Sequence, residues 1–252
     1  FTCHPSLCND SLSGVVLLTI LAETLKNQKH KYSYRFLFVP ETIGTISWLS
    51  LNENKTGRIK HGLVVTCVGD RGKFIYKKSR IGQAKIDLVA EKVLMDSGVD
   101  YSIQEFAPFG SDERQYCSPG FNLPVGSLIR TDYRKKFPEY HTSADNLDYV
   151  RPENLLESLE KYQEILFVLE NDGFYLNLNP KCEPQLGKRG IYRSLGGQKI
   201  SKADDLALFW VLNFSDGQNS LLDIARRSEY SFPRIKKAAD VLLQAELIQK
   251  IN

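Results

Sequence analysis

The sequence has 252 residues, of which 42% are hydrophobic and 25% are charged. This composition excludes a disordered chain, a collagen-like repeat and a disulfide scaffold, and the length allows one large domain or one medium and one small domain. The 33 Lys and Arg residues against 30 Asp and Glu leave a formal charge of +3, which is too small to indicate a polyanionic partner.

The longest apolar run, residues 14–22, falls short of the roughly 20 residues that a membrane-spanning helix needs. We therefore expect a soluble protein with no membrane partner. The five cysteines are scattered without paired spacing, so they give no sign of a disulfide framework or a thiolate zinc site and predict a reducing, cytoplasmic location. The chain opens at Phe1 with a motif already at its third and fourth residues, so we expect upstream sequence to be missing.

Hydrophobic spacing predicts a first helix over residues 11–26, with Asp10 or Ser11 placed to cap it. A mostly apolar strand at 32–39 ends at Pro40, and a short helix is expected at 42–51. The later elements are strands at 62–68, 73–77, 101–106 and 124–130, and helices at 83–97 and 152–170.

The alternation of strands and helices predicts an α/β domain over residues 1–185, with a mostly parallel sheet sandwiched by helices. In such domains ligands bind at the loops that follow the carboxyl ends of the strands. The loops between the predicted elements are therefore the places to look for a site.

The composition changes after residue 177, where prolines and glycines predict a linker, and we place the domain boundary near Leu186. Residues 186–252 are expected to form helices at 204–213, 220–227 and 232–245 and one strand at 247–251, a spacing that resembles a winged helix. This tail has 11 Lys and Arg and 7 Asp and Glu, and it offers one strand for a wing. We expect it to contact protein or to cover the catalytic domain rather than to bind nucleic acid.

Four predicted loops contain residues suited to metal-dependent hydrolysis. They carry His4 with Asp10, Glu41, the run 110–114, and His141. Imidazole and carboxylate groups with one water form a tetrahedral set that zinc accepts, with bonds of ~2.0–2.2 Å. Zinc lowers the pKa of its water toward ~7, and a nearby carboxylate must then carry the proton. Glu41, directly after a strand and a proline, is the best candidate for that base.

Each of these residues also has a purely structural interpretation. Asp10 could cap the following helix, Glu41 could be an acid of the first turn of the helix at 42–51, and His141 could be a packed turn residue. Asp145 is expected to orient His141 or cap a turn rather than to touch a metal. Spacing alone leaves these alternatives open, because the chain has no HExxH or paired-cysteine motif.

The order of the motifs adds a resemblance. It is carried by His4-Pro-Ser-Leu-Cys-Asn-Asp10-Ser-Leu-Ser-Gly14, Arg35-Phe-Leu-Phe-Val-Pro-Glu41, Gly110-Ser-Asp112 and Tyr140-His141-Thr-Ser-Ala-Asp145. In this order they resemble zinc exopeptidases of the aminopeptidase Y and glutamate carboxypeptidase type, and most of all a bacterial aminopeptidase subgroup with a C-terminal winged helix. The match covers most of residues 1–175 and implies a zinc-exopeptidase-like fold.

The resemblance implies a role for each matching residue. His4 is similar to the first metal ligand, Asp10 to the carboxylate that bridges two ions in two-metal relatives, Glu41 to the general base and His141 to the last ligand. Those relatives have a second glutamate where this chain has Thr42, and an aspartate in the strand that here reads Val-Thr-Cys-Val-Gly at residues 65–69. We therefore expect one zinc ion, held by His4, Asp10 and His141, whereas a second would need Asp70 or Asp112.

Two further residues are candidates for substrate binding. Arg114 has a planar guanidinium that can hold a substrate carboxylate, although an ion pair with Asp112 or Glu113 is the simpler interpretation. Tyr116 is placed to line a pocket, although aromatic residues in such loops more often pack in the core. Cys3 and Cys8 flank His4, but neither shows the partner base that a nucleophilic thiol needs.

The sequence thus predicts a zinc-dependent hydrolase that cleaves an amide bond, most simply an aminopeptidase acting on a small peptide or amide substrate. Two alternatives stay open: a non-catalytic metal-binding or regulatory protein that keeps the peptidase fold, and a deacylase of amino sugars. The loss of the second-site carboxylates favours the first of these alternatives. A homo-oligomer is also left open.

Overall fold

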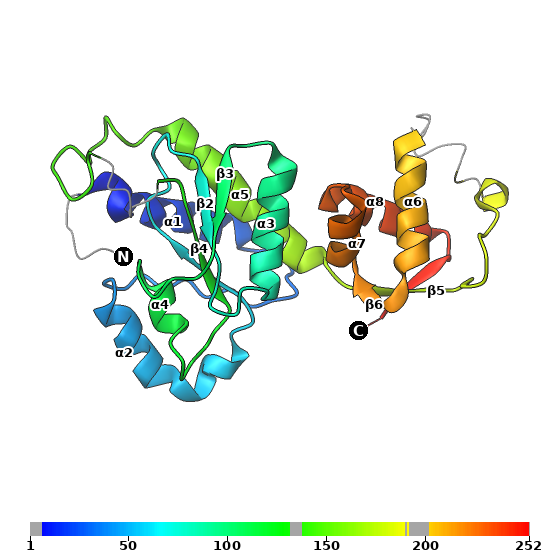
Figure 1. Cartoon of the computed structure of the whole chain (residues 1–252), viewed down its shortest axis with the longest axis horizontal. Helices are drawn as coiled ribbons and strands as arrows, with labels where there is room; N and C mark the ends of the chain where they lie inside the picture. The colour runs from blue at the N-terminus through cyan, green and yellow to red at the C-terminus, as the bar shows by residue number, and fades with distance from the viewer. Residues whose placement is uncertain (1–6, 132–137, 190, 192–201, 252) are drawn as a thin grey trace. The chain divides into compact units, whose positions relative to one another are not determined.

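The structure is a computed structural model that describes residues 7–131, 138–189, 191 and 202–251. The chain divides into two compact units, Phe1–Leu166 and Phe167–Asn252 (Figure 1). The boundary near Leu186 that the sequence indicates falls later than this division. The reason is that Phe174–Asn177 forms strand β5, which pairs with strands of the second unit.

The described part of the first unit contains a four-stranded sheet of β1 (Gly62–Val65), β2 (Phe74–Lys77), β3 (Tyr101–Gln104) and β4 (Val125–Ile129), in the order β1-β4-β2-β3. The pairs β1 with β4 and β2 with β3 are parallel, whereas β2 and β4 are antiparallel. Every residue of β2 and β4 is buried, as expected for inner strands of a sheet covered on both faces. The predicted α/β fold is confirmed, and its four-stranded sheet is mixed, with two parallel pairs and one antiparallel pair.

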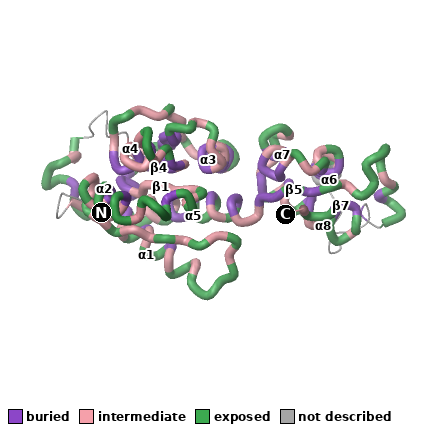
Figure 2. Tube along the Cα trace, turned by 90° about the horizontal axis from the view of Figure 1, so that it is seen from below, coloured by how far each residue is buried: buried purple, intermediate pink, exposed green. Residues whose placement is uncertain are grey.

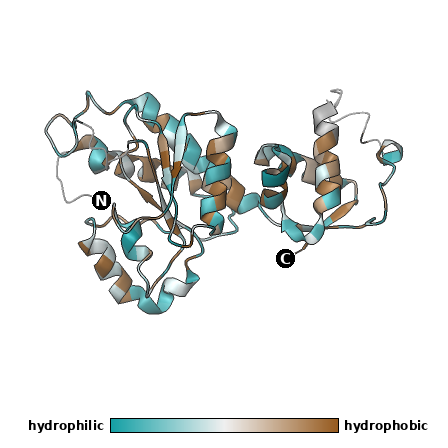
Figure 3. Cartoon of the chain, viewed as in Figure 1, coloured by the Kyte–Doolittle hydropathy of each residue, from teal (hydrophilic) through white to brown (hydrophobic). Residues whose placement is uncertain are grey.

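Helices α1 (Ser13–Leu25), α2 (Ile43–Asn52), α3 (Lys85–Ser97), α4 (Glu113–Tyr116) and α5 (Pro152–Asn171) surround this sheet (Figure 2). Helix α1 packs so closely on β1 that a Cβ at Gly14 would collide with the carbonyl oxygen of Val65. The hydroxyl of Tyr162 on α5 donates to the carbonyl oxygen of Leu128 at 2.6 Å. Hydrophobic residues concentrate along the strands and the packed helices (Figure 3).

The segment that includes η1 (Cys8–Leu12) and α1 has the length and apolar composition of a helix that could cross a membrane. Cys8–Leu25 is long and apolar enough by length and composition, with a mean hydropathy of 1.2, although the run at 14–22 alone is too short. Leu17 and Leu21 of this segment are buried in the first unit. Core helices of globular domains and signal sequences near an N-terminus meet the same criterion, and 39% of this window is buried within the structure.

Three features of the first unit differ from the sequence-based expectation. Residues 32–39 form no strand, because a strand needs a hydrogen-bonded neighbour and none of the described residues provides one. The short helix α4 lies where only a loop was expected, and it is preceded by the buried pair Ser111 and Asp112. Two other short helical turns, η1 (Cys8–Leu12) and η2 (Glu53–Arg58), extend the elements beside them.

The second unit contains helices α6 (Lys202–Phe214), α7 (Leu221–Ser228) and α8 (Phe232–Gln244), the turn η4 (Leu186–Arg189), and an antiparallel sheet of β6 (Asp216–Ser220), β5 and β7 (Ile248–Ile251). Ser220 caps α7 and forms a capping box with Asp223. The three helices and the last strand occur where the sequence predicts them. The expectation of a lone terminal strand is wrong, because β7 pairs with β5.

Candidate active site

Asp10 lies in the turn η1 that leads into α1, and its backbone is held by the carboxylate of Asp145. The N–H of Asn9 donates to Oδ1 of Asp145 at 2.6 Å, and the N–H of Asp10 donates to Oδ2 at 3.0 Å. The side chain of Asn9 donates to Asp70 at 2.7 Å and accepts from the N–H of Gly69 at 2.9 Å. These bonds fix the turn against the loop that follows β1.

The side chain of Asp10 does not cap α1. The residue at the N-cap is Leu12, and no side chain bonds to the first turn of the helix. Instead, Oδ2 of Asp10 lies 3.0 Å from Nε2 of His141, whose ring stacks on that of Tyr140 at 3.7 Å between centroids. The structure therefore brings together two residues that are 131 positions apart in the chain. Asp145 holds the backbone of this aspartate, whereas the sequence suggested that it orients the histidine.

Glu41 follows Pro40 and precedes α2, so it is not an acid of the helix's first turn. Burial raises the pKa of Glu41, and the negative charges of Asp112 and Asp10 act in the same direction. A hydrogen bond from the side chain of Ser111 opposes this rise. A half-buried carboxylate with a raised pKa, next to other acids, is the environment in which enzymes place a general base.

The loop before α4 is held beside Glu41. The N–H of Thr42 donates to Oδ1 of Asp112 at 2.6 Å. The ammonium of Lys77, at the end of β2, donates to the carbonyl oxygen of Phe109 and lies 2.6 Å from Oε1 of Glu113. Both side chains of this ion pair are almost completely buried. The pair links the sheet to the loop that carries Ser111 and Asp112.

The two predicted substrate-binding residues differ in their surroundings. Arg114 makes one hydrogen bond among the described residues, from Nη2 to Oγ1 of Thr42 at 3.4 Å, and it forms no ion pair with Asp112 or Glu113 there. The ring of Tyr116 packs against a core cluster of Leu49, Leu123 and Val125. Burial raises the pKa of Tyr116. This packing accounts for Tyr116, and its role in substrate binding stays a prediction.

The donor atoms of Asp10 and His141 fit part of a zinc site. Two ligand atoms of a tetrahedral zinc ion with bonds of ~2.0–2.2 Å lie about 3.3 to 3.6 Å apart, so a small movement from 3.0 Å would admit the ion. His4, the third predicted ligand, lies outside the described residues, as does Cys3. Within the described residues, no group of three His, Cys, Asp or Glu side chains is arranged to hold a metal.

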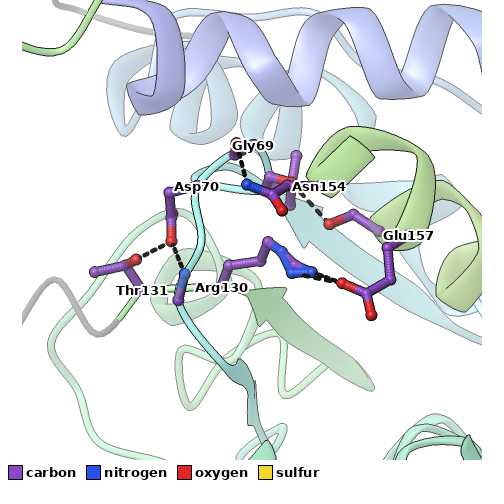
Figure 4. Close-up of polar contacts among 9 residues, drawn as sticks. Gly69, Asp70, Arg130, Thr131, Asn154 and Glu157 are labelled. Carbon is purple, nitrogen blue, oxygen red and sulfur yellow. Dashed lines mark hydrogen bonds and ion pairs between the residues drawn. The ribbon is translucent and has the colours of Figure 1, made fainter. Parts of the chain in front are cut away.

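The two aspartates that a second metal would need have other partners. Asp70 is buried and accepts hydrogen bonds from Asn9, from the N–H of Gly72 at 2.6 Å and from Thr131, as Figure 4 shows in part. Close by, Arg130 reaches Glu157 of α5 at 2.9 Å. Asp112 accepts from Thr42. Lys77 was not predicted, Asn9 was noted only beside Asp10, and Ser111 was expected only as part of the candidate loop 110–114.

This arrangement, on a mixed sheet with a helical second unit, defines a peptidase-like α/β fold joined to a winged helix–turn–helix domain. Residues 1–172 match the family described as "Domain of unknown function (DUF4910)", and the chain belongs to this family. Residues 173–250 match a winged helix–turn–helix family.

Two similar proteins come from Clostridium acetobutylicum. One, provisionally named as a polysaccharide biosynthesis protein with an aminopeptidase-like domain, is 58% identical over 251 residues, which are 100% of this chain and 57% of that protein. A crystal structure of a protein provisionally described as a peptidase is 56% identical, with a TM-score of 0.91 over 99% of this chain and 56% of that one. The chain therefore spans little more than half the length of these relatives.

A more distant structure shows the fold alone. The aminopeptidase from Aneurinibacillus sp. strain AM-1 is 20% identical, with a TM-score of 0.54 over 64% of this chain and 39% of that one.

Proposed function

We propose that this chain carries the active site of a zinc-dependent amide hydrolase, most simply an aminopeptidase. One observation supports this above the others: Oδ2 of Asp10 and Nε2 of His141 are 3.0 Å apart, and Asp10 is also close enough to Glu41 to raise its pKa. One of the proposed metal ligands thus lies within electrostatic reach of the proposed base. His4, Asp10 and His141 would hold the ion.

In this proposal a bound zinc ion supplies Lewis acidity, which polarises an amide carbonyl and lowers the pKa of water. Glu41 accepts the proton of the attacking water and returns it to the departing amine as the C–N bond breaks. Because burial and neighbouring acids raise the pKa of its carboxyl group, Glu41 is a stronger base than an exposed glutamate. Ser111 holds the carboxylate by a hydrogen bond, and Asp145 positions Asp10.

The proposal is tested by hydrolysis of a panel of aminoacyl arylamides, with and without added zinc. We expect zinc-dependent turnover, and a loss of at least about 100-fold in kcat with Glu41→Gln, because that change removes the base and keeps the size of the side chain. The matched control is Glu160→Gln on the exposed face of α5. A rate that survives Glu41→Gln would contradict the proposed role of Glu41.

One observation favours a second substrate class, the amides of amino sugars. The relative that is 58% identical is named for polysaccharide biosynthesis, and the same metal and base serve any amide. N-acetylated amino sugars therefore belong in the panel. Hydrolysis of these compounds without cleavage of any arylamide would assign the site to a deacylase, and zinc binding without turnover of either class would favour a regulatory protein.

A further inference from the structure

We propose that Arg114 is an anion subsite that holds a carboxylate of the substrate beside Glu41. The inference rests on the hydrolase function proposed above and narrows its substrate class. It starts from the charge balance of one short segment, Asp112 to Arg114, in which two acids precede a single arginine. The segment is half-buried or buried throughout, so each of these charges needs a partner.

The two acidic side chains of this segment interact with residues other than Arg114. Oε1 of Glu113 pairs with Lys77 at 2.6 Å, and Oδ1 of Asp112 accepts the N–H of Thr42 at 2.6 Å. Arg114 forms no ion pair with any described residue, and its Nε is buried without a hydrogen-bond acceptor there. Within the part of the chain that the structure describes, its guanidinium makes one hydrogen bond, of 3.4 Å, to the hydroxyl of Thr42.

Arg130 is a buried arginine with a structural role, and its contacts can be compared with those of Arg114. The Nε of Arg130 also lacks a hydrogen-bond partner among the described residues, but its guanidinium forms an ion pair with Glu157 and lies over the ring of Phe74, at 4.3 Å from its centroid. A guanidinium without an acid is costly in a half-buried position, because its loss of hydration is not compensated. A ligand that brings the missing negative charge would offset that cost at Arg114.

The position of Arg114 ties the subsite to the reaction. Its guanidinium contacts Thr42, the residue next to Glu41, and the same threonine is bonded to Asp112. A group held by Arg114 therefore lies close to the bond on which Glu41 acts. The planar guanidinium matches a carboxylate through two parallel hydrogen bonds.

The positive charge at the subsite of Arg114 indicates which class of anion it binds. Lys77, the cation that binds the same loop, is already paired with Glu113, so the described residues give the subsite one positive charge. A single charge matches a carboxylate better than a doubly charged phosphate. The substrate class is accordingly an amide with a carboxylate near the scissile bond, such as a dipeptide with a free C-terminus.

The test compares L-alanyl-L-alanine with L-alanyl-L-alaninamide, which lacks the carboxylate. We expect the protein to favour the free acid by about 10- to 100-fold in kcat/KM, the range that a hydrogen bond to a charged group contributes. Arg114→Met should remove this preference by lowering kcat/KM on the free acid more than on the amide, and Arg114→Lys should restore part of it. Arg80→Met, an exposed arginine bonded to Asn122, is the control. Equal rates on both compounds in the wild type would overturn the subsite.

Binding measurements separate a failure of the subsite from a failure of the proposed function. If the protein hydrolyses neither compound, calorimetry of both compounds with the wild type and Arg114→Met decides. Tighter binding of the free acid that disappears in Arg114→Met supports the subsite even though the peptidase proposal fails. Binding that does not depend on the carboxylate, or no binding at all, overturns it.

Discussion

The carboxylate of Asp145 accepts hydrogen bonds from two consecutive backbone N–H groups, those of Asn9 and Asp10, and so directs the side chain of Asp10 toward His141. A single residue near the end of the first unit thereby sets the geometry of the proposed metal site. Charge-assisted bonds of this kind are stronger than those between neutral groups.

Replacing Asp145 should therefore weaken metal binding without touching a ligand. We expect Asp145→Ala to lower zinc affinity about 10- to 100-fold, the usual effect of removing a residue that orients a ligand. Competition with a chromogenic chelator measures the affinity. Asp148→Ala, an exposed aspartate of the same loop, is the control, and an unchanged affinity in Asp145→Ala would show that the turn keeps its shape without this bond.

His141 is expected to be needed for the metal itself. Protein purified without chelator should contain about one zinc per chain by elemental analysis, because Asp70 and Asp112 are engaged in hydrogen bonds and a second site lacks ligands. His141→Ala should lose the zinc, whereas His30→Ala should keep it. A ratio near two in the wild type would refute the single-ion site.

The bond between Ser111 and Glu41 gives a pH prediction with a definite sign. The bond lowers the pKa of Glu41, and the base works only when it is deprotonated. Ser111→Ala should raise that pKa, so the acid limb of the kcat/KM profile should move to higher pH than in the wild type. Ser118→Ala, outside the cluster around Glu41, is the control. If the acid limb of the profile lies at the same pH in Ser111→Ala as in the wild type, the limb does not report the titration of Glu41.

The buried pair of Lys77 and Glu113 predicts a large cost when one partner is removed. Lys77→Met leaves a buried carboxylate without its cation and should destabilise the first unit by about 3 to 5 kcal/mol. The double change Lys77→Met with Glu113→Gln removes both charges and should recover most of the loss. Urea unfolding followed by the fluorescence of Trp48, with Trp210 replaced by Phe, reports on this unit.

An ion pair with one buried and one exposed partner provides the comparison for that experiment. Lys78 lies 2.9 Å from Glu105, but the glutamate is 76% exposed. Lys78→Met should therefore cost no more than about 1 kcal/mol. Equal losses for Lys77→Met and Lys78→Met would mean that the buried pair has no special role in holding the loop before α4.

The sequence predicts most of the elements because their signals are local. The apolar spacing that buries Leu17 and Leu21 identifies α1 before any partner is known. The same reasoning fails for residues 32–39, since alternation gives strand propensity but cannot supply a neighbouring strand. The boundary near Leu186 was inferred from Pro180 and Pro184, which signal a break more strongly than the short run that forms β5.

The candidate site was predictable only in part. Asp10, Glu41 and His141 were selected by motif order, and the structure places Asp10 beside His141 and within electrostatic reach of Glu41. Glu113 pairs with Lys77, which is 36 positions away in the chain. This pairing leaves Arg114 without an acidic partner among the described residues. No local pattern reports such a pairing, so the sequence favoured the ion pair that the structure lacks.

Because β5 is the central strand of its sheet, it determines which C-terminal fragments can keep that sheet intact. Both β6 and β7 bind to this strand, and Phe167, at the end of α5, contacts Phe232 edge to face. A fragment excised at Leu186 would therefore lose the shared neighbour of its two remaining strands and expose their hydrogen-bonding groups. A fragment that starts at Phe167 would retain the whole sheet, so limited proteolysis should yield a stable C-terminal piece of this longer kind.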